Sequence, residues 1–355
     1  MKGFLKTTRN VVTLVTLFSM LSLTSNALAD QTITSGSSDS IGAALTHAPI
    51  GVMGDHVHNP GEWMVSLRYG QMFMDSNYDN TKKVSTNDIL DSGYMAAPES
   101  MRTYMIMLGM MYGVTDYLTL MAMTSYIKKD MDMTTKMLGN FSTSSEGISD
   151  TKLVGMFQLV DTYAANPRNN YNLHFSVGVS APTGSINQRG DTPMASDVLL
   201  GYPMQLGSGT VDPLIGLTYN YKLEQWVFGS QANAIFRFYD NYKNYRLGNE
   251  YNISGWVGRN LGDYLGLSFR VVGKAWENVK GAASELNPAM SPVNDPNLRG
   301  GERIDAFIGI NLVQPNGLLK NNRLAFEFGM PVYQRLDGPQ LGLNYVFTFG
   351  WQWSF

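Results

Sequence analysis

Methionine recurs at even spacing along parts of this sequence. Met64, Met72 and Met74 are separated by even numbers of residues, so on a β-strand, whose side chains alternate between two faces, they would share one face. Of the 22 methionines, 16 lie between Met53 and Met156. A thioether can fill irregular space in a packed interior, contact aromatic solutes, or bind a soft metal such as Cu(I). All three interpretations stay open.

A second group of residues with metal-binding chemistry lies in the stretch MGDHVH. It contains thioether, carboxylate and imidazole donors at Met53, Asp55, His56 and His58. These are candidate metal ligands, with Cu(I) as the suggested ion. The H-x-H spacing also occurs in solvated turns, and no spacing here matches a closed structural zinc site. The two other histidines of the chain are His47, shortly before this stretch, and His174, on a later segment.

The composition of the sequence limits the fold classes in which these residues can lie. There is no cysteine, which excludes a disulfide framework and thiolate metal sites. Charged residues make up only 15% and aromatic residues 12% of the sequence, while the mean hydropathy is slightly negative. After the N-terminal region no apolar run approaches the roughly 20 residues of a membrane-spanning helix. Such a composition is typical of a transmembrane β-barrel.

The N-terminus predicts a secretory signal peptide over residues 1–29. Lys2, Lys6 and Arg9 precede an apolar run, and a small residue at Ala29 suits cleavage there. Removing these three of the 26 basic residues leaves 23 against 29 acidic ones, a formal charge of −6. We therefore expect an exported protein for which nucleic acid is not a partner.

The C-terminal stretch QLGLNYVFTFGWQWSF alternates large apolar residues with small or polar ones. The large residues fall at every second position: Leu341, Leu343, Tyr345, Phe347, Phe349, Trp351, Trp353 and Phe355. A last strand that ends in Phe355 resembles the assembly signal of bacterial outer-membrane barrels. We therefore expect the outer membrane of a Gram-negative bacterium, with outer-membrane lipid and the barrel assembly machinery as partners.

Similar alternation predicts an all-β fold, a transmembrane antiparallel up-and-down β-barrel of about 12 strands. The segments are 61–74, 101–112, 117–126, 149–159, 171–180, 210–221, 226–238, 249–258, 264–275, 302–312, 322–333 and 340–355. Short periplasmic turns alternate with longer external loops, as in such barrels. The long loops are expected at 75–100, 127–148, 181–209 and 276–301.

A cation on the lipid-facing side of a strand costs about 2–4 kcal/mol at the membrane midplane. We therefore assign the strand face that carries Lys or Arg to the lumen. Arg68, Lys152, Arg237 and Arg270 should point into the lumen, and Trp63, Val65, Leu67 and Tyr69 should face lipid. The same alternation turns most methionines of the first three strands inward, with Met110 as the main exception. The expected luminal methionines are Met64, Met72, Met74, Met105, Met107, Met111, Met121 and Met123; His174 is also expected there.

The remaining residues divide into an N-terminal segment and the barrel. Residues 30–60 are not strand-like and form either a plug in the lumen or a periplasmic segment. We favour the plug, because the apolar stretch APIGVM would be poorly solvated outside. The barrel itself is expected over residues 61–355.

Two motifs resemble a known family. MYGVTDYLTLMAMTSY contains the pattern Y-G-x-T-D-x-L-x-L, and VSAPTGSINQRG contains A-P-T-G. Both resemble the outer-membrane transporters labelled as the MetA pathway of phenol degradation, and the opening APIGVMGDHVHNPGEWMVSLRYG resembles a methionine-rich branch of that family. The resemblance implies a barrel that passes small, including aromatic, solutes. It supplies no ligand residues.

We therefore expect an outer-membrane channel or transporter for small aromatic or amphipathic solutes, and no enzyme. Its wall opposite the methionines would carry Arg237, Arg270, Arg303, Asp305, Arg323 and Glu327, which either orient a solute or pair with one another. A copper-binding protein that uses luminal Met and His is the alternative. A lipid hydrolase is a second alternative, because His174 and Ser176 share a face, similar to outer-membrane phospholipase A; the residues that follow depart from that pattern.

Overall fold

The computed structural model describes residues 47–162, 165–166, 169–317 and 320–355. Contacts divide the chain into residues 1–39 and residues 40–355, and only the second unit contains described residues. The signal peptide, its cleavage after Ala29 and residues 30–46 lie outside the described residues, so those expectations stay predictions.

The described residues contain a closed antiparallel β-barrel. β1 pairs with β3 on one side and with β17 on the other, so the sheet has no free edge along this path. Eleven elements form the closed path: β1 (Trp63–Asn80), β3 (Ala96–Thr115), β4 (Leu118–Thr135), β6 (Thr151–Asp161), β7 (Asn169–Ala181), β10 (Asp212–Leu223), β11 (Trp226–Ile235), β13 (Glu250–Asn260), β14 (Leu265–Trp276), β16 (Gly301–Gln314) and β17 (Asn322–Ser354). The predicted all-β barrel is confirmed.

The element β17 contributes two antiparallel sections. Residues 322–336 pair antiparallel with β16, and residues 336–354 pair antiparallel with β1. An odd number of strands cannot close with every neighbour antiparallel, so β17 turns back on itself. The Phe326 and Phe347 rings, 6.2 Å apart, come from the two sections. Twelve strand sections therefore surround the barrel in the described part of the chain, as predicted.

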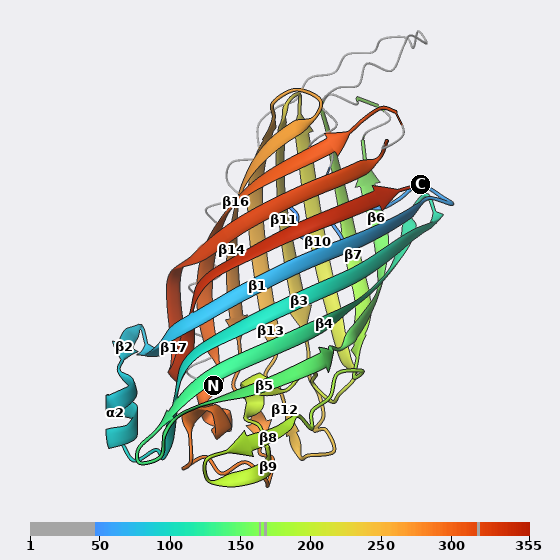
Figure 1. Cartoon of the computed structure of the whole chain (residues 1–355). Helices are drawn as coiled ribbons and strands as arrows, with labels where there is room; N and C mark the ends of the chain where they lie inside the picture. The colour runs from blue at the N-terminus through green and yellow to red at the C-terminus, as the bar shows by residue number, and fades with distance from the viewer. Residues whose placement is uncertain (1–46, 163–164, 167–168, 318–319) are drawn as a thin grey trace, which may run out of the picture. The chain divides into compact units, whose positions relative to one another are not determined.

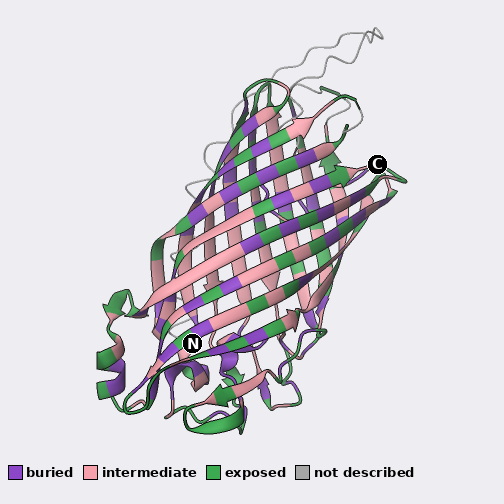
Figure 2. Ribbon diagram, viewed as in Figure 1, coloured by how far each residue is buried: buried purple, intermediate pink, exposed green. Residues whose placement is uncertain are grey.

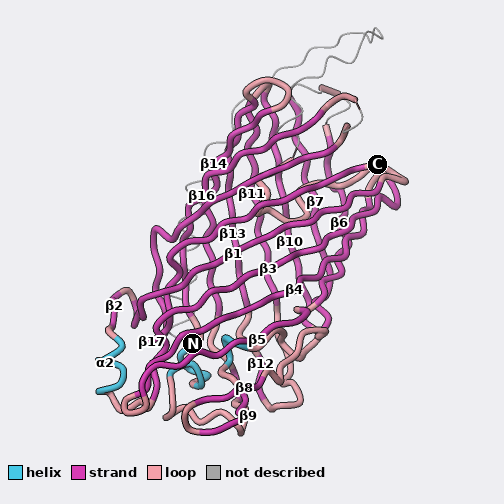
Figure 3. The backbone as a smooth tube through the Cα atoms, in the orientation of Figure 1, coloured by secondary structure: helices cyan, strands magenta, loops and turns pink. Residues whose placement is uncertain are grey.

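Long and short connections lie at opposite ends of the barrel, which we call the long-loop end and the short-turn end. Figure 1 shows the long loops gathered away from the C-terminus. They carry β2 (Lys82–Val84), α2 (Thr86–Asp91), β5 (Gly139–Ile148), β8 (Arg189–Thr192), β9 (Ala195–Leu199), η2 (Tyr202–Met204), β12 (Tyr245–Arg246), β15 (Lys280–Gly281), η3 (Pro292–Asn294) and η4 (Pro296–Leu298). The helical residues lie only in these connections (Figure 3), and no helix of the described residues is long and apolar enough to cross a membrane.

The expected loop at 127–148 is largely strand, and the one at 75–100 is strand at both ends, so these boundaries were wrong. β3 begins at Ala96, β4 runs to Thr135, and β5 pairs along β4 outside the closed path. The reason is that alternation continues past the expected membrane boundary: buried Met131 and Met133 flank exposed Asp132. Backbone pairing in a sheet does not need lipid on its outer face.

Buried and exposed residues alternate along the strands, as the bands in Figure 2 show. In β1, Met64 and Arg68 are only 3% and 4% exposed, whereas Leu67 is 46% exposed. Exposed apolar side chains such as Leu217 and Phe269 continue this outer surface around the sheet. One face of each strand is thus polar or methionine-rich and points inward, and the other is apolar, as a lipid-facing barrel requires.

The C-terminal alternation does not keep one face throughout. A register shift between Phe73 and Met74 leaves Asn344 as an extra residue in β17. Leu343 is therefore turned inward and only 4% exposed, and Leu341 packs against a buried cluster at the long-loop end. The strict period of two predicted from Leu341 to Phe355 holds only after this β-bulge, because one inserted residue exchanges the two faces.

Candidate functional site

Residues 47–60, which we call the inner segment, lie inside the closed sheet. Side chains from strands all around the barrel contact them, including Thr119 of β4, His174 of β7, Arg270 of β14 and Glu327 of β17. A segment that touches strands on all sides of a closed sheet must lie within it. Most of these partners are near the short-turn end.

The wall supplies side-chain donors to the backbone carbonyls of the inner segment. Six carbonyls accept such bonds: Ala48 from Arg323 (2.6 Å), Ile50 and Val52 from Arg68 (2.6 and 3.3 Å), Met53 from Gln231 (2.9 Å), Gly54 from His174 (3.0 Å) and Asp55 from Asn220 (2.7 Å). The segment has no regular secondary structure of its own. Since buried backbone groups must be paired, the wall replaces the partners that a helix or sheet would provide.

An ion pair anchors the tip of the inner segment. Arg270 donates to both carboxylate oxygens of Glu327, at 2.8 and 2.6 Å, and the Gly51 N–H donates to Glu327 Oε2 at 3.1 Å. A Cβ on residue 51 would lie 2.2 Å from Arg270 Nη2 and 2.3 Å from Glu327 Oε2, so any larger residue would displace the ion pair. Arg270 also stacks over the Phe307 ring at 4.2 Å.

Sequence reasoning selected Arg68, Arg270 and His174 but missed Asn220 and Gln231. Both missed residues are polar at inward positions of β10 and β11. Their position, a polar amide on the inner face of a strand, could have identified them as contacts of the inner segment. It did not stand out because barrel interiors are commonly polar.

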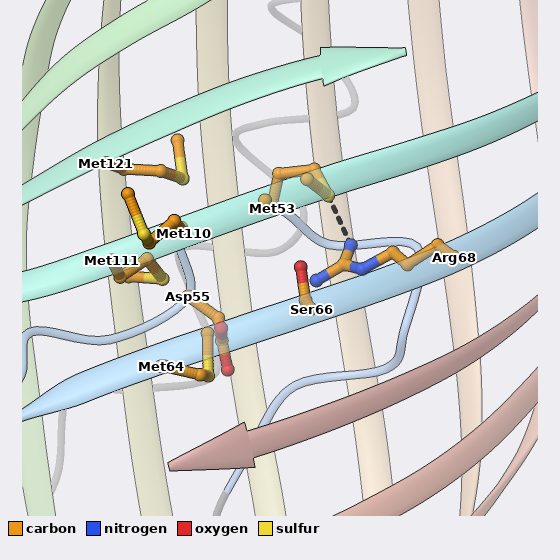
Figure 4. Close-up of a pocket in the computed structure, with 10 residues that line it drawn as sticks. Met53, Asp55, Met64, Ser66, Arg68, Met110, Met111 and Met121 are labelled. Atoms are coloured by element: carbon orange, nitrogen blue, oxygen red, sulfur yellow. Dashed lines mark hydrogen bonds between the residues drawn. The ribbon is translucent and has the colours of Figure 1, made fainter. Parts of the chain in front are cut away.

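Methionines from four strands, β1, β3, β4 and β6, pack around the inner segment near Val57. Met64, Met111 and Met156 form a buried cluster, against which Met121 and Val57 pack. Figure 4 shows a pocket lined by several of these side chains and by Asp55, in which the Met53 sulfur contacts the Arg68 guanidinium. Thioethers here fill irregular space against the segment, which is one of the interpretations left open above.

Other inward methionines lie nearer the long-loop end. Met72, Met105, Met107 and Met123 are half-buried. Beyond them, Met101, Met131 and Met133 are buried beneath loop residues that include Leu200, Met204 and Val293. The methionine-lined wall therefore continues from the inner segment to the long loops, with its most accessible part in between.

Histidines and carboxylates cluster where the two ends of the inner segment, His47 and residues 55–58, come together. We call this region the base of the segment. His56 Nδ1 lies 3.1 Å from Asp55 Oδ1, and His47 Nδ1 lies 3.8 Å from Asp55 Oδ2. His58 Nδ1 lies 3.1 Å from Glu62 Oε1, and its ring is 4.5 Å from that of His56. Met53 faces Arg68 instead. Three of the four metal-ligand candidates are thus close together, with His47 in addition.

Burial and mutual charge set the ionisation of this cluster. Burial lowers the pKa of His47 well below its ordinary value, and it lowers the pKa of His58 to about 4. Burial opposes ionisation of Asp55, yet the adjacent His56 holds the pKa of Asp55 well below its usual range. Burial likewise opposes protonation of His56, but Asp55 raises the pKa of His56. Without a ligand, the cluster contains one Asp55–His56 ion pair beside neutral histidines.

The remaining wall charges pair with one another. Arg237 lies 3.1 Å from Asp212 and 3.0 Å from Glu250, and Arg303 lies 2.8 Å from Asp305. Arg237 follows the end of β11, so the predicted strand 226–238 was too long. Its N–H donates to the Asn249 side chain at 2.8 Å and not to a neighbouring strand.

Glu327→Ala should destabilise the barrel by about 3–5 kcal/mol, since it leaves the buried Arg270 without its carboxylate and the Gly51 N–H without its acceptor. Denaturant titration in phospholipid vesicles measures this free energy. The matched control is Glu285→Ala, which removes ion pairs of Arg189 and Lys243 at an exposed site and should have a much smaller effect. Equal losses in both variants would contradict the anchoring role of Glu327.

Comparison with solved structures shows what the fold is similar to. An outer-membrane channel from Pseudomonas putida F1 matches with a TM-score of 0.56 at 16% identity, covering 85% of this chain and 98% of that chain. The β-domain of the Bordetella autotransporter BrkA matches with a TM-score of 0.42 at 11% identity, covering 84% and 100%. The first likeness supports the outer-membrane barrel fold. No curated protein matches in sequence.

A protein-family model gives the more specific result. The model described as "Putative MetA-pathway of phenol degradation" matches residues 103–328. This region runs from β3 into β17, which is well over half of the chain. The match confirms the resemblance seen in the Y-G-x-T-D-x-L-x-L and A-P-T-G motifs. The chain belongs to the family of the MetA pathway of phenol degradation.

Proposed function

We propose that this protein is an outer-membrane channel for small solutes and that the inner segment closes it reversibly. The proposal rests on the hydrogen bonds that hold the inner segment in the lumen. Its carbonyls are bound by separate polar side chains of the wall, and not by a continuous backbone ladder. Water can replace such bonds one by one, so each contributes only about 0.5–1.5 kcal/mol net, or somewhat more where an arginine donates.

The polar wall also favours a hydrated open state. If the segment leaves, Arg68 and Arg323 lose carbonyl partners but become accessible to water, which is a good acceptor for guanidinium groups. Arg270 and Glu327 can stay paired. A wholly apolar lumen would offer no such compensation.

The solutes that suit this lumen are aromatic or amphipathic. Half-buried Met105, Met107 and Met123 offer polarizable sulfur, which makes favourable contacts with aromatic rings. Across the lumen, Lys274 and Glu250 are paired at 2.9 Å and only partly buried, so they offer polar contacts. A molecule with an apolar body and a polar end matches both walls.

The same proposal includes the location and the orientation of the protein in the outer membrane. The exposed apolar surface faces outer-membrane lipid, the long-loop end is external, and Phe355 presents the assembly signal to the barrel assembly machinery. The chain is exported after cleavage near Ala29. A lipid hydrolase is disfavoured, because His174 is fully buried and its Nε2 is bound to the Gly54 carbonyl.

A reversible disulfide tests the channel proposal. A Cβ on residue 350 would lie 2.8 Å from Ile50 Cγ1, and the chain has no cysteine of its own. In Ile50→Cys/Gly350→Cys, oxidation should fix the inner segment to β17 and abolish solute flux in liposome-swelling assays. Reduction of the same sample should restore flux to the wild-type level.

The two single-cysteine variants are the controls, because they carry the same side-chain changes without the bond. They should respond to neither oxidant nor reductant. Equal flux before and after reduction of the double variant would contradict reversible closure by the segment. A wild-type barrel that passes no solute of any class would contradict the channel itself.

The buried methionine cluster favours copper binding as a second candidate function. The side chains of Met64, Met111, Met121 and Met156 pack together in this cluster, and methionine is a suitable ligand for Cu(I). Purified protein should then retain Cu(I) under reducing conditions, and changing these four residues to Leu should abolish retention. If the wild type retains no Cu(I) against a weak competing chelator, this candidate fails.

A further inference from the structure

The fold of the inner segment brings His47 beside the consecutive residues Asp55 and His56. The candidate ligand atoms of His47, Asp55 and His56 all lie within 4.8 Å of one another. Four ligands at about 2.0–2.1 Å around a tetrahedral zinc ion are separated by roughly 3.3 Å. His56 Nδ1 lies 3.1 Å from Asp55 Oδ1, and His47 Nδ1 lies 3.8 Å from the other oxygen, Oδ2, so each histidine is near the spacing that a shared ion needs.

The histidine nitrogens of this group lack hydrogen-bond partners. His47 Nδ1 and His56 Nδ1 are both buried atoms without a partner among the described residues, although each lies near the Asp55 carboxylate. His56 Nδ1 is 3.1 Å from Asp55 Oδ1 and forms an ion pair with it, whereas His47 Nδ1, at 3.8 Å from Oδ2, is too far for a hydrogen bond. Buried polar atoms are nearly always satisfied, so two such atoms beside one carboxylate point to a shared ligand.

The surroundings orient the carboxylate as metal sites require. Asp55 Oδ2 accepts the Ala48 N–H at 2.8 Å, and the Asp55 carbonyl accepts from Asn220. Ligating carboxylates in metal sites are commonly held by such outer bonds. The nearby Arg323 guanidinium is already engaged by Ala48, Asn311 and Gln352, while Glu62 adds a negative charge beside His58.

We propose that His47, Asp55 and His56 form a binding site for a divalent first-row transition ion, with Zn²⁺ as the reference ion. Two imidazole nitrogens and one carboxylate oxygen are the donors that such ions prefer. No thioether belongs to the set, since the Met53 sulfur contacts Arg68. The site therefore differs in ligands and metal class from the Cu(I) candidate at the methionine cluster.

The bound ion would join the two ends of a loop. Residues 48–54 run between His47 and Asp55, and they include Ile50 and Gly51 at the tip held by Arg68 and Glu327. Linking the ends of a loop lowers the entropy of its open forms. The metal thus stabilises the inner segment in its folded form inside the lumen, and binding itself does not depend on whether the barrel conducts.

Zn²⁺ binding to the full chain, purified in detergent without a histidine tag and stripped with chelator, tests the site. Calorimetric titration with Zn²⁺ should show one ion per chain. His47→Ala and His56→Ala should each weaken binding by at least about tenfold, since even the loss of a supporting residue can cost 10–100-fold. Glu285→Gln, which changes an exposed carboxylate at the long-loop end, should bind as the wild type does.

Asp55→Asn is the variant to use if an alanine variant fails to fold, because the amide oxygen can still accept the Ala48 N–H. It should weaken Zn²⁺ binding while the heat-modifiable mobility of the folded barrel is retained. As an independent readout, Cu²⁺ at the site should show splitting from two nitrogens in its electron paramagnetic resonance spectrum. Absence of stoichiometric binding, or unchanged affinity in His47→Ala, would overturn the site whatever the flux measurements show.

Discussion

The backbone carbonyls of the inner segment are the groups on which the rest of this structure depends. A segment without helix or strand can stay in a barrel interior only if its polar backbone atoms find partners, because an unpaired buried group costs about 1–3 kcal/mol. Here Arg68, Arg323, Asn220 and Gln231 supply those partners. The same polar residues would keep the lumen wettable once the segment leaves.

The methionine wall complements this polar wall. Near the short-turn end, Met64, Met111 and Met156 pack against the segment; near the long-loop end, Met101 and Met131 pack beneath the loops. An unbranched, flexible side chain adapts to irregular surfaces that have no repeating geometry. Methionine therefore suits a lumen whose contents pack well and, in the proposed mechanism, are displaced.

Sequence patterns predicted the faces of the strands well because a residue's face depends on local alternation. Arg68 inward and Leu67 outward follow from the cost of a charge in lipid. The bulge at Asn344, which turns Leu343 inward, could not be predicted, since it depends on pairing with β1 at the far end of the chain.

For the candidate site, the sequence predicts which residues take part but not which of them lie together. Local spacing in MGDHVH drew attention to Asp55, His56 and His58. His47 was noted as a nearby histidine, but Met53 was predicted as the ligand in its place. The partners of the inner segment are distant in sequence: Gly51 and Glu327 are 276 residues apart. Such contacts are set by closure of the barrel, which no local pattern specifies.

Accessibility of the inner segment tests the central claim most directly. In the otherwise cysteine-free chain, Val52→Cys lies at a position that is 3% exposed, and Met137→Cys lies at one that is 82% exposed. A water-soluble thiol reagent should modify residue 52 of the reconstituted barrel far more slowly than residue 137, and Arg68→Ala should speed only the former. Equally rapid modification at both positions would contradict a segment held inside the lumen by its carbonyls.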